Sequence, residues 1–194
     1  MFSTAYTTFL SSMNIDYQQW HDGIGYDLDA LKQLDAAERD EVEAILIEHL
    51  NNPGDWRDVE ALHALGTPRA LEAVRGARRH SVAVVRSRAA QLVGDQSDVE
   101  AAIASGLFDN NGWSQAIDLA EECPTPAVKQ ALLDCSRKGN STARVNAAAM
   151  LLYLCGQAEE PFDWEQRPFF LRFGSDDDAE VQAAWSELRQ RTGL

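Results

Sequence analysis

A repeat of 58 residues constrains the fold of this chain more than any other sequence feature. When the sequence is shifted by 58 positions, Thr67-Pro68 falls on Thr125-Pro126 and Ala89-Ala90 falls on Ala147-Ala148, without a gap. Repetition at a period of this order is typical of folds in which similar helical units stack on one another. We therefore look for the start and end of each helix at equivalent positions of the repeat.

Each unit carries its own signals for the beginning and end of a helix. A threonine followed by proline supplies an N-cap oxygen and then a residue that needs no N–H partner, as at Thr67 and Thr125. Weaker units begin with possible capping boxes, and glycines follow several apolar runs. The boxes are Asp35 with Glu38 and Ser97 with Glu100, and the closing glycines are Gly66, Gly94 and Gly156.

Between these signals the apolar residues follow a helical period. Val42, Leu46 and His49 lie on one side of a predicted helix, and Val85, Ala89 and Leu92 would lie on one side of another. No run of β-branched residues alternates with polar ones between turn signals. We therefore predict an all-α fold of antiparallel helix pairs, about four units in all. Residues 36–156 would hold the repeats, and residues 1–35 and 157–194 would be atypical caps of a single domain.

The clearest copy of the second helix is similar to a known repeat. Val85-Arg86, Ala89-Ala90, Leu92 and Gly94 resemble the short HEAT-like repeat first named from phycobilin lyases, and residues 143–150 are a looser copy. The resemblance implies a HEAT-like α-solenoid, and it does not imply an activity. If the arginines of residues 63–94 do not form a binding groove, Arg86 and Arg144 are expected to make salt bridges between repeats and the other arginines to be solvated.

Charge is unevenly distributed along a chain with a net charge of −14. Residues 1–62 hold 13 acids and 3 bases, whereas residues 63–94 hold 1 acid and 6 bases. A negative field repels nucleic acid and anionic lipid and attracts cationic proteins. We therefore expect a basic protein partner, no nucleic acid and no membrane. An arginine groove on a HEAT-like DNA glycosylase stays open as an alternative.

No catalytic or metal-binding motif is present in the sequence. His21 with Asp22 and Asp27 is the nearest approach to a ligand set, but its spacing matches neither an EF-hand nor a zinc site. Nucleophile elbows and phosphate-binding glycine loops are also missing. We expect no enzyme activity, no cofactor and no metal. An enzyme of the lyase type is the alternative from another class.

Location is inferred from the N-terminus and the cysteines. Residues 1–14 contain no Lys or Arg before their apolar residues, and the three cysteines lack a CxxC spacing. These features favour a cytoplasmic protein. Cys135 and Cys155 lie in apolar helical stretches and are expected to be core residues.

Two aromatic segments at the ends of the repeats resemble small bacterial HEAT-repeat proteins of polymorphic toxin loci. They are residues 20–31 and 161–173, together with Asp55-Trp56-Arg57-Asp58. The resemblance implies an immunity protein that binds a cognate toxin, and a general scaffold or regulator is the other binding role. The residues that we expect to contact the partner are Trp20, Asp22, Asp27, Asp55, Trp56, Asp58, Trp113, Asp163 and Trp164.

Overall fold

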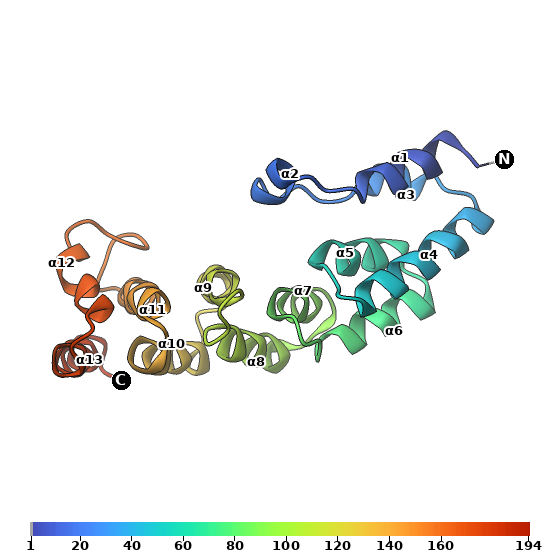
Figure 1. The fold of residues 1–194 in the computed structure, drawn as a ribbon. Helices are drawn as coiled ribbons and strands as arrows, with labels where there is room; N and C mark the ends of the chain where they lie inside the picture. The colour runs from blue at the N-terminus through green and yellow to red at the C-terminus, as the bar shows by residue number, and fades with distance from the viewer. Residues whose placement is uncertain (1) are drawn as a thin grey trace. The chain divides into compact units, whose positions relative to one another are not determined.

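The computed structural model describes residues 2–194 and is built from helices joined by loops, with no strand in that range (Figure 1). The predicted all-α class is confirmed. None of the helices within residues 2–194 is long and apolar enough to cross a membrane. The chain divides into two compact units, Met1–Gly94 and Asp95–Leu194, each with its own hydrophobic core. The expectation of a single domain stays a prediction.

The first unit packs its helices around α5. That helix contacts α3, α4, α6 and α7, and α1 lies against α3. The core includes Phe9, Leu46, Leu62 and Val85, all fully buried. The helices are α1 (Thr4–Ser12), α2 (Tyr17–His21), α3 (Leu28–Lys32), α4 (Ala36–Asn51), α5 (Trp56–Leu65), α6 (Pro68–Ala77) and α7 (Ala83–Val93).

The second unit packs its helices around α11. That helix contacts α9, α10, α12, α13 and the 3-10 helix η1. Phe169, Phe170 and Phe173 are buried in this core, as a capping role predicts, whereas Phe162 and Trp164 are exposed. The elements are α8 (Gln96–Gly106), α9 (Trp113–Glu122), α10 (Pro126–Lys138), α11 (Ser141–Leu154), α12 (Arg167–Phe170), η1 (Leu171–Gly174) and α13 (Asp178–Thr192).

The 58-residue spacing is visible in the helix boundaries. Pro68 and Pro126 begin α6 and α10, and Ala83 and Ser141 begin α7 and α11, so both pairs of starting points are 58 residues apart. The side chains of Thr67 and Thr125 accept the backbone N–H groups of Ala70 and Val128, which confirms both predicted N-caps.

The capping boxes agree with the sequence in one case and differ in the other. Asp35 and Glu38 form the predicted box at the start of α4. The prediction of a Ser97 box is wrong, because the Asp95 carboxylate, two residues earlier, accepts the N–H of Asp98 and starts α8 there. The Ser97 hydroxyl instead donates to Asp95 (2.7 Å).

Glycine ends only some of the helices by left-handed geometry. Gly66 caps α5 with φ +68°, and Gly156 follows the end of α11 with φ +70°, as the sequence predicts. Gly94 ends α7 with φ −83°, which any residue can adopt, so positive φ does not explain this glycine.

The two N-cap threonines also bind glutamates of the preceding helix pair in their own unit. The Thr67 hydroxyl donates to the carboxylate of Glu43 on α4, which is buried. The Thr125 hydroxyl binds Glu100 on α8, and this bond lowers the pKa of the Glu100 carboxyl. Each hydroxyl thus caps its own helix and joins it to an earlier one. This contact repeats in both units although the sequence motif did not include the glutamates.

Removing these hydroxyls should destabilise the unit that carries them. We expect Thr67→Ala to lower the free energy of unfolding by about 1–2 kcal/mol and Thr125→Ala by about 1 kcal/mol. The first effect is larger because Glu43 is buried and would lose its hydroxyl donor, whereas its contact with Arg69 is longer, at 3.6 Å. Urea unfolding followed by circular dichroism measures both. Thr142→Ala, on the exposed face of α11, is the control and should change stability by less than about 0.5 kcal/mol. Equal effects of all three variants would contradict the assignment.

The cysteines differ in burial and therefore in reactivity. Cys135 is fully buried, and burial raises the pKa of its thiol to about 12. Cys123 and Cys155 are partly exposed, and burial raises their pKa values as well. The expected core position is thus confirmed for Cys135 and only partly for Cys155.

Alkylation should separate the three thiols. With iodoacetamide at about pH 8, we expect Cys135 to stay unmodified in the folded protein, because the thiolate is the reactive form. Cys123 and Cys155 should react slowly, and all three should react after unfolding. Mass spectrometry of the digested protein gives the extent at each site. Modification of Cys135 at the rate of Cys123 would show that its burial is wrong.

Candidate functional site

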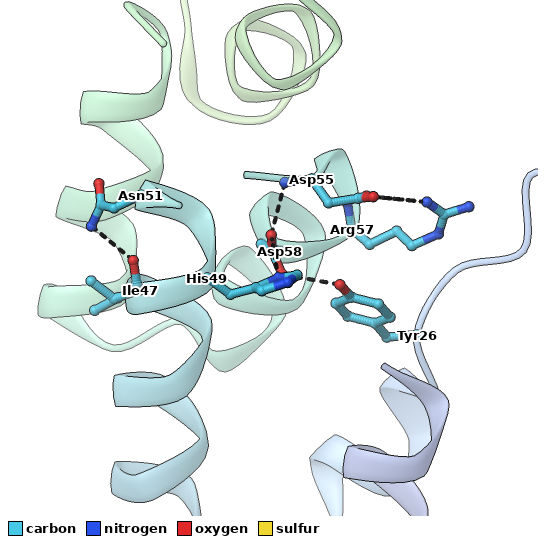
Figure 2. Close-up of polar contacts among 7 residues, drawn as sticks. All are labelled: Tyr26, Ile47, His49, Asn51, Asp55, Arg57 and Asp58. Atoms are coloured by element: carbon cyan, nitrogen blue, oxygen red, sulfur yellow. Dashed lines mark hydrogen bonds and ion pairs between the residues drawn. The ribbon is translucent and has the colours of Figure 1, made fainter. Parts of the chain in front are cut away.

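A fully buried carboxylate, that of Asp58, joins three segments of the first unit (Figure 2). His49 on α4 places its Nδ1 2.9 Å and 3.0 Å from the two carboxylate oxygens. The Tyr26 hydroxyl, from the segment before α3, donates at 3.1 Å, and the Asp55 backbone N–H donates at 2.9 Å. Asp58 therefore fixes the position of α5 against α4 and against the N-terminal segment.

The electrostatics of this cluster follow from its burial. Burial raises the pKa of the Asp58 carboxyl, and the bonds from His49, Asp55 and Tyr26 act in the opposite direction because they favour the ionised form. Burial and the adjacent Asp58 charge raise the pKa of the Tyr26 phenol, which is therefore protonated and able to donate. The arrangement satisfies a buried acceptor with three donors.

A second buried charge, Arg57, attaches the loop between α2 and α3 to the start of α5. Its side chain is 1% exposed, and its Nε donates to the carbonyl oxygen of Ile24 at 2.5 Å. One terminal nitrogen lies 3.1 Å from a carboxylate oxygen of Asp55 (Figure 2). The guanidinium also lies over the Trp56 ring, 4.5 Å from its centroid.

Sequence reasoning did not identify Tyr26, His49 and Arg57 as members of one cluster. His49 did carry a signal, because it lies on the inward side of a predicted helix, where a polar side chain needs a partner. Nothing in the spacing indicated that the partner would be Asp58. Asp58 itself was predicted to contact a partner protein, but in this structure it is buried and holds the fold together.

The Asp58 cluster should contribute strongly to the stability of the first unit. We expect Asp58→Ala to lower the free energy of unfolding by about 3–5 kcal/mol, because His49 and Tyr26 would lose a buried partner. Asp29→Ala is the matched control, since the Asp29 side chain is exposed and pairs with Lys32 at the surface, and it should leave the denaturant midpoint close to that of the wild type. Denaturant unfolding measures both. A loss below 1 kcal/mol for Asp58→Ala would contradict the role assigned to the cluster.

The predicted contact residue Trp20 lies on α2, which is the most exposed helix of the first unit, and Asp22 is the C-cap of that helix. The chain leaves α1, forms α2 and returns to α3 (Figure 1). None of the five residues of α2 is buried. Trp20 is 62% exposed and Tyr17 is 76% exposed, and their rings stack at 6.1 Å. With Ile24, which is 48% exposed, they form what we name the N-terminal aromatic patch.

The acids beside this patch are held in place by neighbouring groups. The Asp22 carboxylate accepts bonds from Gln18 (2.9 Å and 3.0 Å) and contacts His21 (3.1 Å), and these bonds lower its pKa. Asp16 forms a capping box with Gln19 at the start of α2. Asp22 and Asp16 therefore present negative charge next to the exposed rings.

Asp163 and Trp164 lie in a second exposed segment, which belongs to the second unit. Residues 159–165, here named the C-terminal acidic loop, surround a hollow of about 430 Å³. Trp164 is 72% exposed, and the Arg167 guanidinium lies 4.3 Å from its ring centroid. The Asp163 carboxylate accepts the backbone N–H groups of Glu159 and Glu165, so it holds the loop together.

The other predicted contact residues are mainly engaged in the fold. Asp27 and Asp55 cap α3 and α5. Trp113 is partly buried against the core of the second unit, and Trp56 is partly buried beneath Arg57. The structure thus brings Asp55, Trp56 and Asp58 together at the start of α5 and leaves Trp20, Asp22 and Trp164 as the exposed members of the set.

Most arginines of the basic band 63–94 are occupied by partners within the first unit. Arg69, Arg75 and Arg88 pair with Glu43, Glu72 and Glu60. These pairs leave few free guanidinium groups for a nucleic-acid backbone.

The predicted salt bridges of Arg86 and Arg144 are wrong. Arg86 donates to the carbonyl oxygens of His80 (2.7 Å) and Ser81 (2.8 Å). Arg144 donates to those of Phe173 (2.8 Å) and Ser175 (2.9 Å). Both guanidinium groups therefore bind backbone carbonyls, in the loop after α6 for Arg86 and in and just after η1 for Arg144, because these segments present backbone oxygens where the prediction placed carboxylates.

Residues 2–194 contain no group of three or more His, Cys, Asp or Glu side chains placed to hold a metal ion. Comparison of the chain with protein-family models, with curated proteins and with solved structures finds no match in any of the three. The exposed surfaces of the two units are therefore the features of this protein that indicate a function.

Proposed function

We propose that this protein is a non-enzymatic binding module that recognises a basic protein partner through exposed aromatic side chains set among carboxylates. The observation that carries the proposal is α2, a helix with no buried residue that exposes Tyr17 and Trp20 together. Tyrosine and tryptophan are the side chains that most often dominate binding energy at protein interfaces. Their exposure on a helix that contributes nothing to the core supports a role in contact with another molecule.

Charge supports a cationic partner. The N-terminal aromatic patch is flanked by Asp16 and Asp22, and the C-terminal acidic loop surrounds Trp164 with four carboxylates. Aromatic faces attract Lys and Arg side chains, and nearby carboxylates strengthen this attraction. The Arg167 guanidinium over Trp164 is an example of this contact within the chain.

We also propose that the helix pairs are HEAT-like antiparallel repeats of a solenoid, with the two aromatic segments at its ends. Solenoids offer long surfaces to partners rather than closed reaction centres. The 58-residue spacing of helix starts and the repeated threonine–glutamate contact support the repeat. In its most specific form, the partner is a toxin, and the protein is the immunity protein that shields the toxin's active site.

The test is coexpression with the product of a neighbouring toxin-like gene. We expect the wild-type chain to protect the host cell and to copurify with the toxin. The double variant Tyr17→Ala/Trp20→Ala should weaken binding at least tenfold, since hot-spot aromatics each contribute more than about 1 kcal/mol. Isothermal titration calorimetry measures the affinity. Association should also slow as salt is raised from about 50 mM to 500 mM, because the attraction is electrostatic.

Leu171→Ala is the matched control, since Leu171 is 49% exposed but lies in η1, outside both the N-terminal aromatic patch and the C-terminal acidic loop. It should leave both affinity and protection unchanged. Trp164→Ala tests the C-terminal acidic loop separately. A toxin that binds the double variant as tightly as the wild type would refute the role of α2, and a toxin-like neighbour that is neither bound nor neutralised would refute the immunity role.

A further inference from the structure

The first unit contains an open groove whose chemistry is opposite to that of the aromatic segments. It has a volume of about 560 Å³ and lies along α4, α6 and the loop between α6 and α7. None of its lining residues is acidic, although the chain has a net charge of −14. The lining residues are Ile47, Leu50, Asn51, Ala73, Gly76, Ala77, Arg79, His80 and Ser81.

Nothing in the fold requires a glycine at position 76, near the end of α6. A β-carbon at this position would meet no atom within 4 Å, and the backbone does not adopt positive φ. Glycine in a helix costs about 0.5–1 kcal/mol relative to alanine. Neither close packing nor backbone geometry requires this cost here. Its effect is to leave the backbone of α6 open to whatever occupies the groove.

Arg79 is an arginine without an internal partner in a region where the others are engaged. Its side chain is exposed and makes no hydrogen bond or ion pair with any residue in the range 2–194. By contrast, Arg75, on α6, pairs with Glu72, whereas Arg79 lies in the loop after that helix. An unpaired guanidinium beside apolar surface is suited to bidentate binding of a carboxylate.

The neighbouring polar groups are also donors. The His80 Nδ1 accepts the backbone N–H of Val82 at 3.1 Å, so the neutral ring carries its proton on Nε2. Asn51 donates to the Ile47 carbonyl oxygen at 2.8 Å (Figure 2), and both residues line the groove. Ile47 and Ala73 add partly exposed apolar surface between these groups.

We propose that this groove binds an acidic peptide segment of a partner protein, with a Glu or Asp carboxylate on Arg79 and apolar side chains over Ile47, Leu50 and Ala73. An open groove suits a peptide better than a small molecule, because small-molecule sites enclose most of their ligand. The site goes beyond the proposed function, since it would bind a partner of the opposite charge. It does not depend on the N-terminal aromatic patch.

A random peptide library displayed on phage, about 12 residues long, is the direct probe. Selection on the full-length wild-type chain, after depletion on Gly76→Phe, should enrich peptides that combine Glu or Asp with Leu or Ile. The phenylalanine fills the groove from an open position on α6, and replacing glycine inside a helix should not destabilise the fold. Circular dichroism confirms that the variant is folded.

Rhodamine-labelled copies of the enriched peptides then give affinities by fluorescence anisotropy. We expect Arg79→Ala to weaken binding at least about tenfold, as the loss of a charged hydrogen bond predicts, and Gly76→Phe to abolish saturable binding. Gly76→Ala and Arg75→Ala are the matched controls and should stay within about twofold of wild type.

Three results would overturn the proposal. The first is enrichment of basic peptides, or enrichment of none above the Gly76→Phe background. The second is equal affinity of the selected peptides for wild type and Arg79→Ala. The third is displacement of the peptides by millimolar hexanoate alone, which would make a small organic acid the occupant.

Discussion

The first unit depends on one buried carboxylate, that of Asp58. An ionised group in the interior is tolerated only when donors satisfy it, and here the donors come from α4, from the segment before α3 and from the turn before α5. These segments are separate in sequence. The hydrogen bonds that they donate to the Asp58 carboxylate therefore fix their relative positions. Arg57 extends the same constraint to the loop after α2 through the Ile24 carbonyl oxygen. The exposed helix α2 is thus held at its C-terminal side by buried polar contacts and not by an apolar face of its own.

The 58-residue repeat is visible in side-chain contacts as well as in the sequence. Thr67 and Thr125 each cap a helix and bind a glutamate of an earlier helix in the same unit. Arg86 and Arg144, also 58 residues apart, each direct a guanidinium group at two backbone carbonyl oxygens. These carbonyls belong to loops or, for Phe173, to the short helix η1, where backbone acceptors would otherwise need water. The repeated residues thus supply hydrogen-bond partners to backbone groups that the helices themselves do not pair.

Charged side chains in this protein differ in role: some are paired within the fold and others remain available at the surface. Arginines of the band 63–94 that appeared to form a basic surface are largely paired with acids or carbonyl oxygens, and Arg79 is an unpaired one that lines a groove. Acids near the aromatic residues Trp20 and Trp164 stay at the surface. An acidic chain can therefore offer two kinds of surface, one suited to cations and one to anions, because pairing with carboxylates and carbonyl oxygens occupies most arginines of the band 63–94 and leaves Arg79 available.

Local features were predictable from the sequence because their causes lie within a few residues. The all-α class, the N-caps at Thr67 and Thr125 and the helix end at Gly66 follow from apolar period, capping oxygen and backbone freedom. The Ser97 box failed because two acceptors competed within three residues, and only the folded chain shows that Asp95 prevails. Contacts between distant residues were not predictable in this way. Tyr26 and Asp58 are 32 positions apart, and Arg57 and Ile24 are 33 apart. Their meeting depends on how whole helices pack, which no spacing records, so tertiary structure alone decided that Asp58 is interior and that Trp20 faces solvent.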